Sequence, residues 1–162
     1  MFKNSYFNFI FSLVVVMITG ILCSWFNRVG MANFYEQIQK SALTPPNIVF
    51  PIVWTILYIL LVLAFDIVLN IHDKPIMPSV WSFIGNMALQ VIWCWVFFNN
   101  GQFMIGLIVL FALDIATAVL IWQFYRLDYT AGLLLLPYMI WLLFATYLNA
   151  VVVALNGNNF IA

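Results

Sequence analysis

The chain has 162 residues, of which 67% are hydrophobic and 6% are charged, and its formal net charge is zero. A water-soluble domain of this length cannot bury so much apolar surface, so the composition excludes a soluble globular protein. The few Lys and Arg residues also argue against nucleic acid as a partner, because nothing is available to neutralise its phosphates. We therefore predict a multi-pass integral membrane protein embedded in a lipid bilayer.

Charged and turn-forming residues divide the chain into five apolar spans. Each is long enough to cross a hydrocarbon core of about 30 Å as a helix that rises about 1.5 Å per residue. We expect them at residues 6–26, 47–71, 80–98, 102–125 and 131–155. Short loops join the last four, so neighbouring spans should run antiparallel. The predicted fold is an all-α integral membrane protein, a single domain over residues 1–162 formed by one bundle of five transmembrane helices.

The start and the orientation of the chain are less strongly determined. A cleaved signal peptide is the competing interpretation of residues 6–26, but the apolar run is longer than usual and no small-x-small site follows it. With five spans, Lys3, Lys74 and Arg126 lie on one side of the membrane, and Arg28 and Lys40 lie on the other. Three basic residues against two lean towards a cytoplasmic amino terminus and leave the topology open.

The one long predicted connection covers residues 27–46. Loops of more than about 12–15 residues are uncommon in compact proteins and often cover a binding site. Phe34 and Tyr35 help to give this loop an apolar side, and Pro45 and Pro46 end it stiffly before the second span. We therefore expect a lid over a cavity between the helices. A solvated connector is the alternative.

Aromatic and amide side chains repeat at helical spacing on the second, third and fifth spans. Residues three, four or seven positions apart share one face of a helix. Amides inside hydrocarbon are unfavourable unless they face other helices or a cavity, so these faces should converge inside the bundle. We expect a ligand pocket there, formed by Trp54, Tyr58, Asn86, Gln90, Trp93, Tyr138, Trp141, Ala145 and Leu148. The alternative is that Asn86 and Gln90 only join helices through hydrogen bonds.

Other chemically active residues give weaker signals. Asp66 and Asp114 lie within spans and are candidates for function or for protonated hydrogen-bonding groups. Neither has a basic partner in its own span, which disfavours proton-coupled transport. Cys23 and Cys94 lie in apolar runs, as buried packing cysteines do. The chain contains no metal-ligand or phosphate-loop motif, so we expect neither a metal nor a cofactor.

Four separated segments resemble the TspO/MBR family, whose members are also called translocator proteins, tryptophan-rich sensory proteins or peripheral benzodiazepine receptors. Their order and spacing agree with the family over nearly the whole chain, most specifically in the fifth span. The segments are Phe34-Tyr35 with Lys40-Ser41-Ala42-Leu43-Thr44-Pro45-Pro46, then Pro51-x-x-Trp54-x-x-Leu57-Tyr58, then Asn86-x-x-x-Gln90 with Trp93 and Phe97-Phe98, and finally Ala131 through Pro137-Tyr138-x-x-Trp141-x-x-Phe144-Ala145-x-x-Leu148-Asn149.

The resemblance implies a five-helix protein, often a homodimer, that binds porphyrins and other tetrapyrroles at the loop-covered end of the bundle. In some members sterols and benzodiazepine-type ligands also bind. The residues that the resemblance assigns to ligand contact are Trp54, Asn86, Gln90, Trp93, Trp141, Ala145 and Leu148. A membrane receptor or carrier for tetrapyrroles is the expected function. Five spans without an inverted repeat do not supply the usual alternating-access design, so transport is the weaker part of this expectation.

Two alternatives to the receptor stay open. Some bacterial members degrade porphyrin photochemically, and by resemblance Trp54 and Trp141 would be the reacting tryptophans of a light- and oxygen-dependent enzyme. A regulatory membrane protein with no small-molecule role is the other alternative.

The chain also departs from the family pattern. Ser41 and Leu43 stand where the loop pattern has Pro and Trp, which implies a looser lid. Near the end of the last span, Ala150 and Ala154 occupy the places of the Tyr and the basic residue attributed to sterol recognition. A sterol site of that kind is therefore not expected.

Small residues favour close approach of helices at two places. They are Ser82, Gly85 and Ala88 on the third span and the pair Ala112-x-x-x-Ala116 on the fourth. They are the physical reason to expect a homodimer, and packing within one chain is the alternative.

Overall fold

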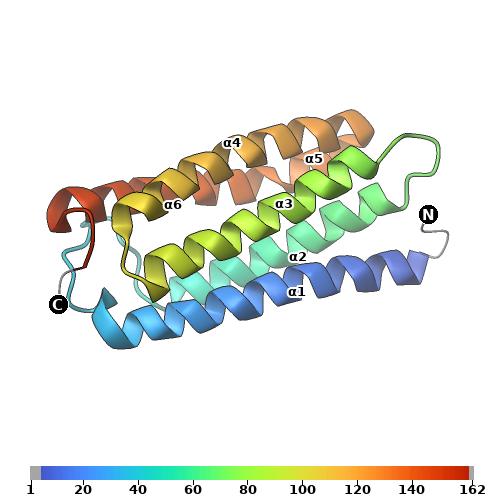
Figure 1. The fold of residues 1–162 in the computed structure, drawn as a ribbon. Helices are drawn as coiled ribbons and strands as arrows, with labels where there is room; N and C mark the ends of the chain where they lie inside the picture. Colours follow the sequence, from blue (N-terminus) through green and yellow to red (C-terminus); the bar gives the residue numbers. More distant parts are fainter. Residues whose placement is uncertain (1–4, 161–162) are drawn as a thin grey trace.

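The five predicted spans correspond to five long helical segments in the computed structural model, which describes residues 5–160 (Figure 1). The described residues form helices joined by loops, and no strand occurs among them. The segments long and apolar enough to cross a membrane are Ser5–Tyr35, Val49–Leu69, Met77–Asn99, Phe103–Leu127 and Tyr129–Asn156. The prediction of an all-α, multi-pass membrane protein is confirmed.

Three of these segments are built from more than one helical element. The elements in chain order are α1 (Ser5–Gly30), the π-helix η1 (Met31–Tyr35), α2 (Val49–Leu69), α3 (Met77–Cys94), the π-helix η2 (Trp95–Asn99), α4 (Phe103–Leu127), α5 (Tyr129–Leu134) and α6 (Leu136–Asn156).

The first segment is longer than predicted, and the loop after it is shorter. The predicted span ends at Phe26, but the helix continues through Arg28 to Gly30 and then widens into the π-helical turn η1. Arg28 does not end the helix, because the aliphatic part of a long arginine side chain can pack against apolar surface while its guanidinium group reaches water. Phe34 and Tyr35 are therefore buried at the end of the first segment, and the connecting loop is residues 36–48.

The last segment is broken at Leu135 instead of running straight from residue 131 to 155. Pro137 stands in the first turn of α6, where a missing N–H is tolerated, and it cannot continue the hydrogen-bond ladder of α5. Asp128 caps the start of α5 by accepting a hydrogen bond from the Ala131 amide at 3.0 Å. The short α5 and the long α6 together form the fifth segment.

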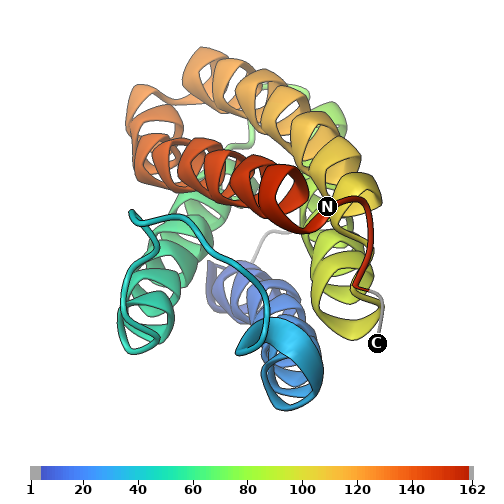
Figure 2. The same cartoon turned by 90° about the vertical axis from the view of Figure 1, so that its left-hand side faces the viewer.

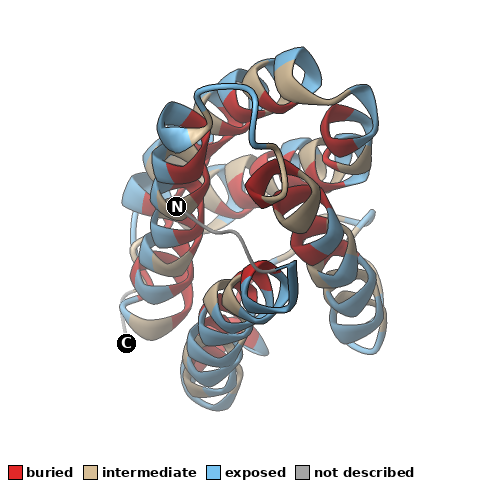
Figure 3. Ribbon diagram, turned by 90° about the vertical axis from the view of Figure 1, so that its right-hand side faces the viewer, coloured by how far each residue is buried: buried red, intermediate tan, exposed pale blue. Residues whose placement is uncertain are grey.

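The helices stand around a shared interior. α1 packs on α2 and α3, and α4 packs on α3, α5 and α6. On its other side α2 packs on α5 and makes few contacts with α6 (Figure 2). Buried residues face inward and exposed residues face outward on every helix (Figure 3). The outward side chains are largely apolar, as contact with lipid requires.

The end of the bundle away from residues 36–48 is solidly packed. Phe65 and Phe83 stack there with ring centroids 4.0 Å apart, and Phe124 lies 6.0 Å from Phe83. All three rings are fully buried. These rings leave little space between the helices at this end.

The carboxyl-terminal tail is fastened to the loop end of the bundle. The Phe160 amide donates to the Gly101 carbonyl at 2.8 Å, and the Phe160 ring stacks on Phe34 at 5.2 Å. Gly101 has a φ of 61°, which glycine adopts without strain, and this lets the chain turn from η2 into α4. The Phe34 ring also lies 5.8 Å from the Phe103 ring at the start of α4. Phe34, Phe103 and Phe160 therefore form one aromatic cluster that joins η1, α4 and the tail.

Candidate functional site

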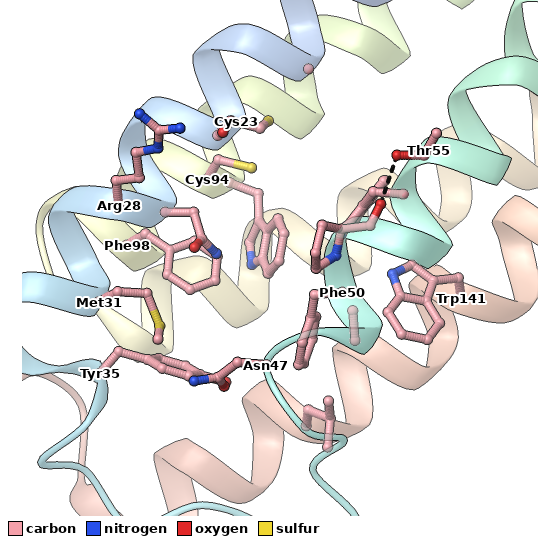
Figure 4. A pocket seen from close by; sticks show the side chains of 18 of the residues that line it. Cys23, Arg28, Met31, Tyr35, Asn47, Phe50, Thr55, Cys94, Phe98 and Trp141 are labelled. Carbon is pink, nitrogen blue, oxygen red and sulfur yellow. Dashed lines mark hydrogen bonds between the residues drawn. The ribbon is translucent and has the colours of Figure 1, made fainter.

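A cavity of about 430 Å³ lies inside the bundle beneath residues 36–48 (Figure 4). Most of its wall is apolar. Among the predicted site residues, those that line it are Trp54, Tyr58, Trp93, Trp141, Ala145 and Leu148. They come from α2, α3 and α6, so the structure brings together residues from the three spans that the sequence pattern singled out.

Aromatic rings form two opposite sides of the cavity. Phe50 and Trp141 lie on the side of α2 and α6, with centroids 5.9 Å apart in an edge-on arrangement. Tyr35 and Phe98 lie across from them, on the side of η1 and η2, with centroids 5.7 Å apart (Figure 4). The space between is bordered by ring faces and edges, which suits a flat apolar molecule.

The amides of the third segment lie behind the wall, together with Tyr138. Asn86, Gln90 and Tyr138 are fully buried and do not line the cavity. The Tyr138 hydroxyl lies 3.0 Å from Asn86 Oδ1 and 3.1 Å from Gln90 Oε1. Asn86 Nδ2 donates to Thr117 Oγ1 at 2.8 Å, and Gln90 Nε2 donates to Tyr58 Oη at 3.0 Å. These amides therefore join α2, α3, α4 and α6, and Tyr58 links their network to the cavity.

A second polar contact fixes the orientation of Trp93. Its indole Nε1 donates to Asn149 Oδ1 at 3.3 Å, and Asn149 Nδ2 donates to the Phe103 carbonyl at 2.9 Å. A Cβ atom on Gly106 would lie 3.1 Å from Asn149 Oδ1, so this position on α4 leaves room for the amide. With its N–H satisfied inside the protein, Trp93 presents ring surface to the cavity.

Sequence reasoning missed a polar edge of the cavity on α1. Gly20, Ser24 and Arg28 follow one another at four-residue spacing, and all three border the cavity with Asn27. Arg28 is exposed and makes no hydrogen bond or ion pair with another described residue. The helical spacing was visible in the sequence, but ending the first span at Phe26 separated these residues from the helix that carries them.

Polar contacts fasten the loop of residues 36–48 over the bundle. Gln39 and Asn156 exchange two hydrogen bonds, each 2.8 Å long, between the loop backbone and the Asn156 amide. Lys40 Nζ donates to the Tyr35 carbonyl at 2.8 Å and lies 4.5 Å from the centre of the Tyr35 ring. Ser41 Oγ lies 3.3 Å from Tyr147 Oη.

The residues assigned to the predicted lid occupy different places. Tyr35 lines the cavity, whereas Phe34 packs in the aromatic contact with Phe103. Pro45 is half-buried and Pro46 is exposed, and neither lines the cavity. The loop side of the cavity is formed by Asn47 instead, whose Nδ2 donates to Glu36 Oε1 at 3.2 Å.

The intramembrane acids lie outside the cavity, and the cysteines lie on its wall. Asp114 Oδ2 accepts a hydrogen bond from Thr146 at 2.8 Å, and Asp66 Oδ1 accepts one from Asn70 at 3.0 Å. Cys23 and Cys94 are buried free thiols that border the cavity.

Comparison with known proteins agrees with this arrangement. Residues 11–155 match the sequence profile of the TspO/MBR family, which covers all five segments. The chain belongs to the TspO/MBR family. It is 33% identical over 153 residues to the tryptophan-rich protein TspO of Archaeoglobus fulgidus, covering 90% of this chain and 95% of that protein.

Other TspO/MBR relatives come from bacteria and animals. The chain is 33% identical over 126 residues to the tryptophan-rich sensory protein of Cereibacter sphaeroides, covering 78% of each chain. It is 30% identical over 121 residues to the human translocator protein, covering 72% of this chain and 71% of the human one. The resemblance drawn from the four segments is thereby confirmed.

Proposed function

We propose that this TspO/MBR protein is a membrane receptor or carrier that binds a porphyrin or another tetrapyrrole in the cavity beneath residues 36–48. The observation that carries the proposal is the aromatic lining, with Phe50 and Trp141 facing Tyr35 and Phe98. A flat conjugated macrocycle stacks favourably on such rings. The cavity volume of about 430 Å³ falls within the range of roughly 300–1,000 Å³ that is usual for small-molecule sites.

Arg28 supplies the charge that this ligand class needs. Natural porphyrins carry carboxylate groups on one edge of an otherwise apolar ring. The cavity has one basic residue on its wall, at the edge formed by α1, and the described residues offer it no acidic partner. A guanidinium binds carboxylates through directed, charge-assisted hydrogen bonds. The ligand would place its carboxylate edge at Arg28 and its ring between the aromatic sides.

The buried amides have an indirect part in this proposal. Gln90 donates to the Tyr58 hydroxyl, and the Tyr138 hydroxyl lies within hydrogen-bonding distance of both Gln90 and Asn86. Tyr58 is the member of the network that borders the cavity. Asn86, Gln90 and Tyr138 would therefore contribute to binding by fixing the position of the Tyr58 ring.

A dark titration with protoporphyrin tests the proposal. Purified protein is titrated while tryptophan quenching is followed, and saturable binding is expected. Ala145 lines the cavity, so Ala145→Phe should fill it and weaken binding more than about tenfold, the equivalent of about 1.4 kcal/mol. Ala154→Phe is the matched control, because Ala154 is exposed on the same helix and does not line the cavity. Equal affinity in both variants would contradict the assignment.

The positions of Trp54 and Trp141 favour a second candidate, light- and oxygen-dependent degradation of the bound porphyrin. Both indoles border the cavity and so would contact the ligand. Illumination of the titrated samples in air should then bleach the porphyrin band with turnover, and Trp54→Phe or Trp141→Phe should abolish the bleaching. Bleaching at the rate of free porphyrin in the same detergent would leave the receptor as the function.

We also propose that the protein forms a homodimer through α3. Gly85 and Ala88 are exposed on the outer face of this helix, and Ser82 is half-buried beside them. A Cβ atom added at Gly85 would meet no atom of the same chain within 4 Å, so the space beside it is open to a second copy. Small residues on a membrane helix allow another helix to approach closely.

A further inference from the structure

A long apolar groove runs along the outside of the bundle between α1 and α2. Its volume is about 640 Å³, and nearly all of its lining is aliphatic or aromatic. The side chains that line the groove alone are Phe9, Leu13, Val16, Met17, Ile21, Trp25, Ile59, Val62 and Leu63. Most of them are exposed on helices that cross the membrane, so the groove opens to lipid.

The groove and the inner cavity share one wall. Gly20, Ser24, Arg28, Thr55 and Tyr58 border both. On α1 this wall has no side chain at Gly20, where an added Cβ would lie 2.9 Å from the edge of the Tyr58 ring. A single tyrosine ring packed against a glycine therefore separates the two spaces at this point.

α1 and α2 are joined at the end far from the cavity. There Asn8 Nδ2 donates to the Leu69 carbonyl at 3.1 Å and to Asn70 Oδ1 at 3.0 Å. From residue 12 to residue 28, the described side chains of α1 make no hydrogen bond to α2, since Ser12 and Thr19 bond their own helix and Cys23 bonds α3. At the cavity end, van der Waals contacts alone hold the two helices together.

The loop of residues 36–48 is held over the cavity more firmly than α1 is held against α2. To open it, the paired bonds between Gln39 and Asn156 must break, and so must the Lys40 contact with Tyr35. To part α1 from α2, apolar contacts between helices are exchanged for apolar contacts with lipid tails, which are equally hydrophobic. The side of the bundle is therefore the easier place to open.

We propose that the ligand reaches the cavity from the bilayer, passing sideways between α1 and α2 over the Gly20–Tyr58 contact. The inference rests on the proposed function and adds the route to it. The ligand class is an apolar, membrane-partitioning ring with an acidic edge. Arg28 borders both the groove and the cavity, so it can hold the acidic edge while the ring moves from one space to the other.

Binding kinetics in lipid nanodiscs test this route, with protoporphyrin already dissolved in the bilayer and its fluorescence as the signal. Ile21→Phe with Ile59→Phe narrows the groove without touching the cavity. The matched control is Ile18→Phe with Ile56→Phe, on the same two helices. The exposures of the changed residues are 60% and 56% in the groove pair against 53% and 53% in the control, and the control residues line neither space.

The groove variant should slow association and dissociation together by about fivefold or more, with an unchanged dissociation constant, because a path acts on both rates equally. The control should behave as wild type.

Unchanged rates in the groove variant, together with faster binding in the loop-loosening variant Asn156→Ala, would overturn the proposal in favour of access through the loop. Efficient cross-linking of two Ile21→Cys copies would overturn it too, by placing a second copy over the groove. Failure of the proposed function looks different, since wild type itself would then show no saturable binding.

Discussion

Replacement of Arg28 by glutamine isolates the electrostatic part of the proposed binding. Gln keeps a polar side chain of similar reach at the α1 edge of the cavity and removes the positive charge. Arg28 is exposed and has no partner among the described residues, so no ion pair inside the protein is lost with it. The change should therefore leave the fold intact and act on an acidic ligand alone.

The expected effect is modest because Arg28 lies at an open edge. An ion pair exposed to water is worth about 0.2–1 kcal/mol, and charge-assisted hydrogen bonds at a partly closed site are stronger. A loss of about 1 kcal/mol corresponds to a roughly fivefold rise in the dissociation constant. The effect should shrink as salt is added, since the Debye length falls from about 10 Å at 0.1 M to about 3 Å at 1 M.

Two ligands and one control variant make the test decisive. Protoporphyrin and its dimethyl ester share the macrocycle, and only the former carries carboxylates. Arg28→Gln should weaken binding of the acid and leave the ester unchanged. Arg126→Gln is the matched control, because Arg126 lies at the end of α4, over the Trp122 ring at 5.4 Å and outside the cavity. Equal weakening of both ligands would refute the charge argument, since it would show that Arg28 acts through packing.

Three further changes probe the bundle itself. Phe83→Ala should destabilise the protein in mixed-micelle unfolding by about 2 kcal/mol, less than in a soluble core because the ring stays in an apolar phase on unfolding, whereas Phe111→Ala, at an exposed site, should cost little. Asn86→Ala should cost about 1 kcal/mol in the same assay, because the Thr117 hydroxyl loses its amide donor and the Tyr138 hydroxyl loses one of its two amide contacts, and no loss at all would contradict the network. Gly85→Leu should reduce cross-linking of two copies without lowering the unfolding midpoint, and dimers that persist would exclude α3 as the interface.

Span length and apolar composition were enough to predict the five segments, because a hydrocarbon core of fixed thickness imposes both on any helix that crosses it. The ends of the segments were harder to place. The predicted loop of residues 27–46 includes Arg28, but α1 continues past this residue and brings it to the cavity edge. The break at Leu135 follows from Pro137, whose effect depends on whether a new helix starts nearby.

Only part of the site could be predicted from the sequence, because helical spacing gives no information about the neighbouring helices. Helical spacing shows which residues share a face, but it does not show which neighbouring helix that face meets. Asn86 and Trp93 were assigned to one ligand-facing group, and the structure places Trp93 on the cavity wall and Asn86 behind it. Depth inside a bundle depends on how helices diverge, and here α2 packs on α5 but makes few contacts with α6. The part of Asn86 in ligand binding stays a prediction.

The contact between Phe160 and Phe34 has a practical consequence for anyone who makes this protein. Phe34 precedes Tyr35, which forms part of the cavity wall, so the last described residue of the chain supports that wall from behind. A purification tag fused directly after the tail would disturb that support, and a truncation after Gly157 would remove it. Affinities measured on such material would describe a weakened cavity wall. A tag placed before Ser5 avoids the problem, because α1 begins at the opposite end of the bundle (Figure 1).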